Sequence, residues 1–336
     1  MDAAAALDEI AFRLERELAP SFKVKAFRGA AASIRDFSAD ELADRVRDGR
    51  LKRMKGIGAR TLEVISQAVA GDVPDYLADL REREPQPLTG AAGELLSQLR
   101  GDLHAHTDWS DGGSPIEVMA EAARTLGREY LAITDHSPHL TVAHGLSAER
   151  LTEQLGAVTA VDDELDEPRL LTGIEVDILE DGTLDQTPEL LDWLDVVVAS
   201  VHSHLRADKR TMTSRMLAAI RDPHTNVLGH CTGRLVTGGR GTRPPSHFDA
   251  EAVFAACAEN DVAVEINSRP ERQDPPDDLI AVALDAGCLF SIDTDAHAPG
   301  QLDFLRLGAE RAASCGVPAE RIITTWPAER LTQWLR

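Results

Sequence analysis

The chain has 336 residues, of which 43% are hydrophobic and 27% are charged. This length accommodates one large domain plus a smaller one, and the apolar fraction is that of an ordinary packed globule. The formal net charge of −22 argues against indiscriminate nucleic-acid binding by the whole surface, because phosphate affinity depends on clustered Lys and Arg. The charge is uneven, however, since residues 23–60 carry about 11 basic against about 5 acidic residues. A local basic patch is therefore available.

Targeting signals are not evident in the sequence. The segment from Met1 to Leu18 is acidic and lacks the basic start and apolar centre of a signal peptide. No apolar run approaches the ~20 residues needed to span a bilayer. Widely spaced cysteines without a C-x-x-C pair suit a reducing compartment: Cys231, Cys257, Cys288 and Cys315. We expect a cytoplasmic protein with no membrane partner.

Residues 1–83 show helical patterns, beginning with an amphipathic helix that places Leu7, Ile10 and Leu14 on one face. Within them, a turn with two glycines is followed by a helix and resembles a helix-hairpin-helix. Glycines let the backbone approach a phosphate closely, and the free N–H groups of the following helix face it. The predicted DNA contacts are Lys52, Arg53, Lys55, Gly56, Gly58 and Arg60. A simple packing corner between two helices is the alternative.

Residues 84–97 are rich in Pro and Gly and predict a linker between two domains. From residue 98 to residue 336, short strands alternate with helical stretches, which predicts an α/β domain. One strand precedes His104, and the others are expected at 131–134, 170–174, 196–201, 227–228, 262–266 and 289–292.

Histidines and carboxylates recur at the carboxyl ends of these strands. In a β/α barrel those ends converge on one face, so residues far apart in sequence are expected to meet there. Imidazole and carboxylate ligands without thiolate suit Zn, Mn or Fe. The candidate metal ligands are His104, His106, Asp111, His136, Glu175, His202, His230, Asp295 and His297. Nine such groups exceed the four that one closed zinc site needs.

The motifs at these positions resemble those of the PHP (polymerase and histidinol phosphatase) phosphoesterases. They are Leu103-His-Ala-His-Thr107, Ile133-Thr-Asp-His136, Gly173-Ile-Glu-Val-Asp-Ile178, Ser200-Val-His-Ser-His204 and Asp293-Thr-Asp-Ala-His297. The segment Gly229-His-Cys-Thr-Gly-Arg-Leu235 is most similar to the PHP domain of bacterial family X DNA polymerases. Residues 1–83 are similar to the N-terminal DNA-binding domain of the same polymerases.

The resemblance implies a distorted (β/α)7 barrel, related to the TIM barrel, behind a small all-α helix-hairpin-helix domain. It also implies three divalent metal ions. His104, His106, Glu175 and Asp295 would bind the first ion, Glu175, His202 and His230 the second, and Asp111, His136 and His297 the third. Among these ligands, Glu175, His106, His202 and Asp295 are the predicted catalytic residues. Asp135 and Asp293 are expected to orient histidines, which ligating imidazoles generally require.

Two departures from the polymerases limit the expected activity. Only the short linker separates the two regions, so the polymerase fingers and palm are missing and nucleotide polymerisation is not expected. The lysine that performs the lyase reaction in some relatives would fall at Val64, which cannot form a Schiff base.

The leading hypothesis is a metal-dependent phosphodiesterase in DNA repair, acting as a 3′–5′ exonuclease or a 3′-end or abasic-site processing nuclease. Its partners would be single-stranded, damaged or nicked DNA and other repair proteins. The candidate substrate contacts are His204, Arg234, Asn267 and Arg272, with Lys209, Arg240 and Arg243 as weaker ones. The alternatives are a small-molecule phosphatase of the histidinol-phosphate type and a catalytically inactive DNA-binding adaptor.

Overall fold

The computed structural model describes residues 1–239 and 241–335, and the chain divides into two compact units, Met1–Pro87 and Leu88–Arg336. The prediction of a linker over 84–97 is wrong in its second half, because helix α6 (Gly90–Gln98) forms there and packs against α13 (Leu305–Ser314). One of the glycines that suggested a linker, Gly93, has a packing role. A Cβ at Gly93 would lie 2.5 Å from the Leu88 carbonyl oxygen.

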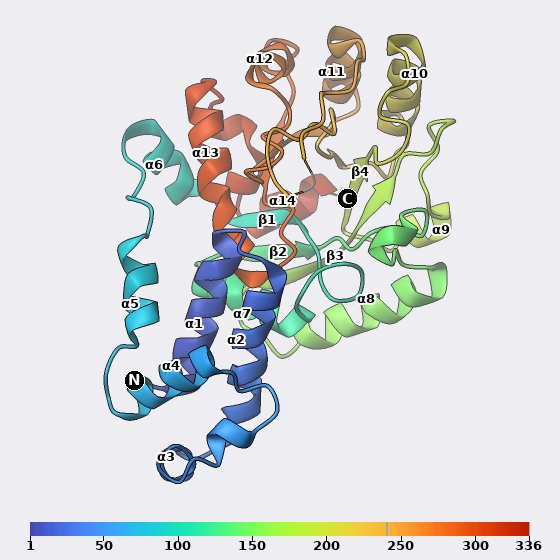
Figure 1. Cartoon of the computed structure of the whole chain (residues 1–336). Coiled ribbons are helices and arrows are strands. Elements are labelled where there is room, and N and C mark those ends of the chain that lie inside the picture. Colours follow the sequence, from blue (N-terminus) through green and yellow to red (C-terminus); the bar gives the residue numbers. More distant parts are fainter. Residues whose placement is uncertain (240, 336) are drawn as a thin grey trace. The chain divides into compact units, whose positions relative to one another are not determined.

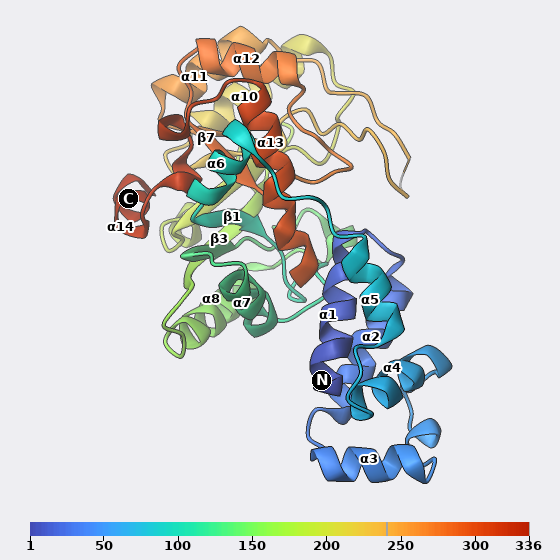
Figure 2. The same cartoon turned by 90° about the vertical axis from the view of Figure 1, so that its left-hand side faces the viewer.

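The first unit is entirely helical in its regular structure. Its elements are α1 (Ala3–Arg16), α2 (Ser21–Ile34), α3 (Ala39–Arg47), the 3-10 turn η1 (Leu51–Arg53), α4 (Ala59–Val69) and α5 (Asp75–Glu82). Helix α1 packs against α2, α4 and α5 through its predicted apolar face, and Leu7 and Ile10 are fully buried. Figure 2 shows α1, α2, α4 and α5 grouped together. Val64 is also fully buried in this core.

The predicted hairpin connects η1 to α4. Gly56 adopts φ +90°, a backbone conformation that side chains with a Cβ rarely accept. Gly58 forms the N-cap of α4, and its N–H donates to Oγ1 of Thr61 over 2.9 Å. All six residues predicted to contact DNA are exposed in this segment.

Seven parallel strands form the centre of the second unit, in the simple order β1 to β7. They are β1 (Gly101–Ala105), β2 (Tyr130–Ile133), β3 (Arg169–Asp177), β4 (Val196–Ser200), β5 (Val227–Leu228), β6 (Ala263–Asn267) and β7 (Phe290–Asp293). The sheet curves into a nearly closed barrel, which confirms the predicted fold class. Sequential order is expected when each strand is followed by a crossover helix, because such connections are short and right-handed.

Helices surround the strands (Figure 1). Besides α6 and α13 they are α7 (Ile116–Thr125), α8 (Ala148–Asp162), α9 (Pro188–Leu191), α10 (Lys209–Ile220), α11 (Ala250–Glu259), α12 (Asp277–Asp285) and α14 (Ala328–Leu335). Short 3-10 turns complete the unit: η2 (Thr141–Ala143), η3 (Pro299–Phe304), η4 (Ala319–Arg321) and η5 (Ile323–Thr325). Among residues 1–239 and 241–335, no helix has both the length and the apolar character that crossing a bilayer requires.

Alternation along the strands separates the helix-covered core from the barrel interior. On β3, Ile174 and Val176 belong to the large core shared with the helices, whereas Leu171 packs with residues of the other strands and with Trp326. Because side chains alternate along a strand, Glu175 and Asp177 share the face of Leu171 and lie nearer the carboxyl end. The interior is therefore apolar at one end and carries ionisable groups at the other.

Side chains close the seam between the first and last strands. The Leu103 N–H donates to Asp293 over 2.8 Å, and Asp102 accepts from the N–H and the hydroxyl of Thr294. Farther along, the His106 N–H donates to the Ala296 carbonyl over 2.8 Å. These bonds bring the ends of β1 and β7 together, although about 190 residues separate them in sequence.

Candidate metal centre

The buried carboxylate of Glu175 lies at the centre of a ring of histidines. The carboxylate is 1% exposed. The neighbouring imidazoles come from the ends of four strands, two of them from β1 and one each from β2, β4 and β5. Its Oε1 lies 2.8 Å from Nε2 of His230, 3.2 Å from Nε2 of His202 and 3.4 Å from Nε2 of His104. Its Oε2 lies 2.8 Å from Nδ1 of His136 and 3.6 Å from Nε2 of His106. One carboxylate thus faces five imidazoles.

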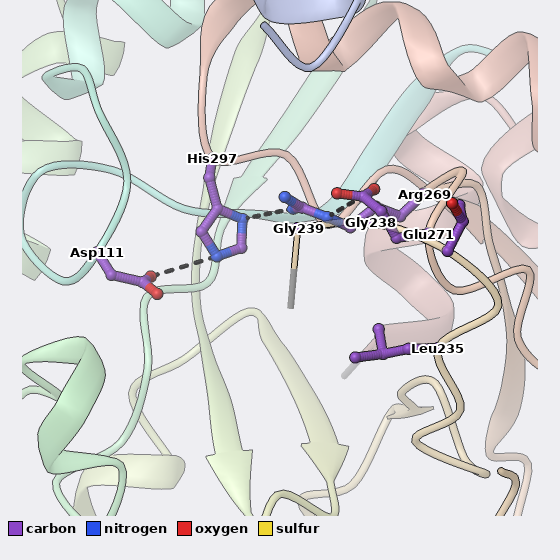
Figure 3. Close-up of a pocket in the computed structure, with 8 residues that line it drawn as sticks. Asp111, Leu235, Gly238, Gly239, Arg269, Glu271 and His297 are labelled. Carbon is purple, nitrogen blue, oxygen red and sulfur yellow. Dashed lines mark hydrogen bonds and ion pairs between the residues drawn. The ribbon is translucent and has the colours of Figure 1, made fainter. Parts of the chain in front are cut away.

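A second group of ligand atoms gathers around Asp111. Its Oδ1 lies 3.3 Å from Nε2 of His297 and 3.5 Å from Nε2 of His136. Figure 3 shows His297 between Asp111 and Arg269. Asp295 approaches from β7, with Oδ1 3.4 Å from Nε2 of His106. The nine predicted ligands, from His104 to His297, therefore converge on one region.

Three overlapping groups of these residues offer ligand atoms within 4.8 Å of one another. They are His106, Asp111, His136 and His297; His104, His106 and Glu175; and His136, Glu175 and His202. These groups could hold metal ions, and imidazole with carboxylate is the ligand set of Zn, Mn and Fe sites. His106 and His136 each belong to two of these groups. The resemblance, in contrast, assigns each histidine to a single ion. How the ligands divide among three ions remains our proposal.

Unsatisfied polar atoms inside the cluster fit metal binding. Within the described part of the chain, Nε2 of His104, His106 and His202 and Oε2 of Glu175 are buried and form no hydrogen bond. A buried polar atom without a partner normally costs about 1–3 kcal/mol. Nitrogen and oxygen atoms that can each offer a lone pair face one another here, so a divalent cation between them would satisfy the imidazoles and the carboxylate together.

The electrostatics of the cluster also favour bound positive charge. Burial opposes ionisation of Glu175, but His202 and His104 outweigh it and hold the pKa of this carboxyl well below its usual range. Burial likewise opposes protonation of His202, yet Glu175 and Asp177 raise the pKa of its imidazole to about 9. A bound divalent cation would provide this positive charge in place of the protons on the histidines. The imidazoles would then be neutral, because metal binding displaces their protons.

Two carboxylates contact histidines that are candidate metal ligands and orient their rings, and neither was predicted for this role. Asp177 contacts Nδ1 of His202, which directs Nε2 of that ring toward Glu175. Glu265 lies 2.6 Å from Nδ1 of His104 and accepts from the backbone N–H of His230. Both acids lie within strands. On the same face of the strand and two residues away, Asp177 has Glu175 as its neighbour and Glu265 has Asn267. That spacing was visible in the sequence.

The role expected for Asp135 and Asp293 was wrong. Asp135 accepts from the N–H and the hydroxyl of Thr107 and from the side chains of Ser110 and Gln154. It therefore shapes the loop after β1. Asp293 binds the Leu103 N–H at the seam instead of an imidazole. Both sit at strand ends as predicted, but backbone and hydroxyl donors lie closer to them than any histidine ring nitrogen does.

We predict that Asp177→Asn weakens metal binding by about 10- to 100-fold, the usual effect of losing a carboxylate that orients a ligating histidine. The change keeps the side-chain shape and removes the charge facing His202. Competition with a chelator, followed by metal analysis, measures the affinity. Asp181→Asn, in an exposed turn, is the matched control. Equal metal retention by the two variants would refute the orienting role.

The residues predicted to contact substrate are placed less uniformly. Arg272 is buried and its Nε donates to Asp295 over 2.8 Å, so it supports a candidate ligand. Asn267 donates to Glu265 and Asp295. Arg234 donates to the carbonyls of residues 272 and 273, outside the cluster. His204 is exposed and pairs with Glu180 over 2.7 Å.

The weaker basic candidates are also accounted for where the structure describes them. Lys209 lies 3.4 Å from Asp249, and Nε of Arg243 donates to the Gly233 carbonyl over 2.6 Å. Arg240 lies outside the described residues. Sequence reasoning missed Arg269, which donates to the Asp295 carbonyl over 2.6 Å and lies 2.9 Å from Nδ1 of His297. Its only sequence signal is its position just after a strand that ends in polar residues.

Comparison with known families assigns both parts of the chain. Residues 102–269, half of the chain, match the PHP domain. The chain belongs to the PHP family. Residues 1–72 match a helix-hairpin-helix domain. The PHP match includes seven of the nine clustered residues, and the remaining two, Asp295 and His297, follow β7.

Individual relatives of this PHP protein point to two kinds of phosphoesterase. It is 38% identical over 217 residues to the DNA polymerase/3′-5′ exonuclease PolX of Bacillus subtilis, a match that covers 65% of the chain and 37% of the relative. It therefore spans well under two thirds of that relative's length. The probable phosphatase YcdX of Escherichia coli K12 is 27% identical over 247 residues, covering 68% of the chain and 91% of YcdX.

A solved structure is also similar. It is a histidinol phosphate phosphatase from Lactococcus lactis, complexed with zinc, L-histidinol and phosphate. It matches with a TM-score of 0.46 and 18% identity, over 65% of this chain and 92% of that protein.

Proposed function

We propose that this PHP protein is a metal-dependent phosphodiesterase that acts on DNA, as a 3′–5′ exonuclease or a 3′-end or abasic-site processing nuclease. The observation that carries the proposal is the presence, in one chain, of a helix-hairpin-helix domain and a PHP domain whose nine candidate ligands converge. The 38% identity to a relative named as a 3′-5′ exonuclease supports the same activity. The complete cluster speaks against the inactive adaptor.

The first unit supports DNA as the substrate. Lys52, Arg53, Lys55 and Arg60 are exposed around the Gly56–Gly58 turn, and the N-terminus of α4 follows directly. Backbone N–H groups at a helix N-terminus and clustered cations bind phosphate without reading base sequence. Such a module would hold a DNA strand in a sequence-independent way. The overall charge of −22 disfavours phosphate binding elsewhere on the surface, which makes the basic segment the best candidate for it.

The reaction would replace the bond from phosphorus to the leaving oxygen by a bond to a water oxygen, and the leaving oxygen would take up the proton that the water gives up. Divalent ions held by the cluster would lower the pKa of a bound water, so that it can attack near neutral pH, and would offset charge on the phosphoryl oxygens. Glu175, with imidazoles on both oxygens, would hold two ions together. Asp177 and Glu265 fix the His202 and His104 rings, and the buried Arg272 keeps Asp295 in place.

A small-molecule phosphatase is the second candidate function. The match to YcdX, named a probable phosphatase, covers 91% of that protein, so its length corresponds to the barrel unit alone. In this case the helix-hairpin-helix domain would have a role unrelated to the substrate. The two candidates share the metal centre and differ in what binds beside it.

Digestion of end-labelled DNA separates the two functions. Protein supplied with Mn²⁺ is incubated with single-stranded, duplex and abasic DNA, and in parallel with histidinol phosphate. We expect stepwise release of mononucleotides from the 3′ end and little free phosphate from histidinol phosphate. In His106→Ala, nucleotide release should fall by at least about 10³-fold, because this ring faces both Glu175 and Asp295.

Two results would count against the proposal. Release of phosphate from histidinol phosphate without any DNA cleavage would favour the small-molecule phosphatase. Equal DNA digestion by the parent protein and His106→Ala would assign the activity to a contaminant.

A further inference from the structure

Arg215 of α10 has a buried guanidinium whose hydrogen bonds to the described residues all go to neutral oxygens. The residue is 2% exposed. Its Nε donates to the carbonyls of Ile178 and Leu179 over 3.0 and 2.7 Å, and its Nη2 donates to the Ile178 carbonyl as well. Its Nη1 donates to the Ser203 carbonyl over 2.8 Å, and Nη2 also donates to Oγ of Ser203 over 3.1 Å. One side chain thus binds two loops, the loop after β3 and the loop after β4.

The burial of this cation is not explained by stability alone. A buried charge is normally held by an opposite charge, and apolar side chains of similar volume often fill such positions at least as favourably. Arginine differs from every other residue in presenting a planar fork of N–H donors, which can reach two backbone segments at once. The hydrogen bonds of Arg215 use the fork in this way.

The two backbone segments carry the two partners of one contact in the candidate metal centre. Ile178 follows Asp177 in the sequence, and Ser203 follows His202. Asp177 contacts Nδ1 of His202, and Nε2 of the same ring lies 3.2 Å from Glu175. The guanidinium therefore joins the backbone next to the carboxylate to the backbone next to the imidazole.

Strand pairing does not extend as far as His202. The parallel pairing of β3 with β4 ends at Asp177 and Ser200, two residues before His202. Beyond that pair the loop after β3 packs closely on α10, since a Cβ at Gly182 would lie 2.7 Å from the Arg215 carbonyl oxygen. Helix α10 therefore supports both segments where the sheet no longer sets the distance between them.

We propose that Arg215 is a positioning residue that holds His202 against Asp177 and thereby sets the affinity of the metal group that contains His202. This group consists of His136, Glu175 and His202. Arg215 acts through the backbone, and its charge would have the opposite effect, because a cation close to the centre repels metal ions. The inference rests on the metal centre of the proposed function and holds for either candidate substrate.

Arg215→Lys separates geometry from charge. Lysine keeps the positive charge on an apolar stem, but a single ammonium replaces the planar fork. The full-length protein is stripped with a chelator and titrated with Mn²⁺, and electron paramagnetic resonance quantifies the free ion. We expect about tenfold weaker binding in one step of the titration and little change in the others, because only one of the three groups contains His202. Arg210→Lys, exposed on the same helix, is the matched control and should bind Mn²⁺ like the parent.

Arg215→Met gives a result whose direction is informative. Removal of a cation near the centre would, by electrostatics alone, strengthen Mn²⁺ binding. Loss of positioning weakens it instead, and we expect a decrease of about tenfold or more in the same step of the titration.

A double-mutant cycle tests whether Arg215 acts through the contact between Asp177 and His202. Asp177→Asn weakens that contact directly. In the Asp177→Asn background, Arg215→Lys should therefore change the Mn²⁺ affinity by only about twofold, since residues that act through one contact are not additive.

Two results would overturn the proposal. Mn²⁺ affinity equal to that of the parent, or tighter, in Arg215→Lys and Arg215→Met would leave Arg215 with a role in the fold only. An equal loss of affinity with and without Asp177→Asn would show that Arg215 affects the metals by another route. The substrate assays report separately on the proposed function: hydrolysis of histidinol phosphate without DNA cleavage refutes the nuclease and leaves the role of Arg215 intact. A parent protein that binds no Mn²⁺ would refute the metal centre and this inference together.

Discussion

Glu175→Gln is expected to abolish phosphodiester hydrolysis, with a loss of at least about 10³-fold, and to lower the bound metal content. The amide has nearly the same shape, so packing is retained. However, it removes the negative charge that faces five imidazoles, at 2.8 to 3.6 Å from its two oxygens. Elemental analysis of the purified protein and initial rates on end-labelled DNA, both at saturating Mn²⁺, measure the two effects.

The position of Glu175 explains why its substitution should reduce activity and metal content more than substitution of any other candidate ligand. Like His106 and His136, it belongs to two of the three groups that could hold an ion, but it alone contacts both His202 and His230, through the same oxygen. Glu259→Gln removes the same charge from an exposed helix position and should match the parent in both measurements. Full metal content with full activity in Glu175→Gln would rule out the bridging role that we propose for this carboxylate.

Phe254→Ala is expected to have the largest effect on stability, about 3–5 kcal/mol less favourable for the barrel unit. Phe254 lies on α11 and is fully buried in the core between helices and strands. Its ring packs edge-on against Phe248, with centroids 6.0 Å apart. Truncation leaves a cavity that the surrounding strands and helices can fill only in part. Phe254→Leu is the milder comparison, at about 1.5 kcal/mol or less.

Tryptophan fluorescence follows this unfolding selectively. The chain has four tryptophans, and Trp109, Trp193, Trp326 and Trp334 all lie in the second unit. Urea titration monitored by their emission therefore reports the barrel unit without a signal from the helical unit, which matters because multi-domain chains rarely unfold in one step. A midpoint for Phe254→Ala equal to that of the parent would show that the site is not part of a rigid core.

The barrel and the convergence of the candidate ligands were predictable, because the ends of the strands are marked in the sequence by polar residues. Polar residues such as His136 and His202 follow short apolar segments, and parallel strands with crossover helices bring such ends to one face. The strand predicted at 227–228 matches β5, and the others differ by a few residues at their ends. One consequence is that Glu175 lies within β3 instead of after it.

Contacts between side chains were less predictable. Asp135 and Asp177 both lie near candidate ligands in sequence, yet only Asp177 contacts an imidazole. The oxygens of Asp135 accept hydrogen bonds from donors in the loop after β1 instead. Arg269 could not be singled out among the arginines, since its neighbours Asp295 and His297 come from another strand end. Helix α6 was missed because its two glycines suggested flexibility, whereas Gly93 accommodates a close backbone contact.

The seam between β1 and β7 has a consequence for how the molecule is made. The bonds that Asp102 and Leu103 form across the seam go to residues 293 and 294, so nearly the whole barrel must be synthesised before the ring can close. Contacts this distant in sequence form late, because loop closure must be completed first. The same event delivers Asp295 and His297 to their histidine neighbours. A nascent chain on the ribosome would therefore acquire its chemistry in one final step, after its helical first unit has had time to fold.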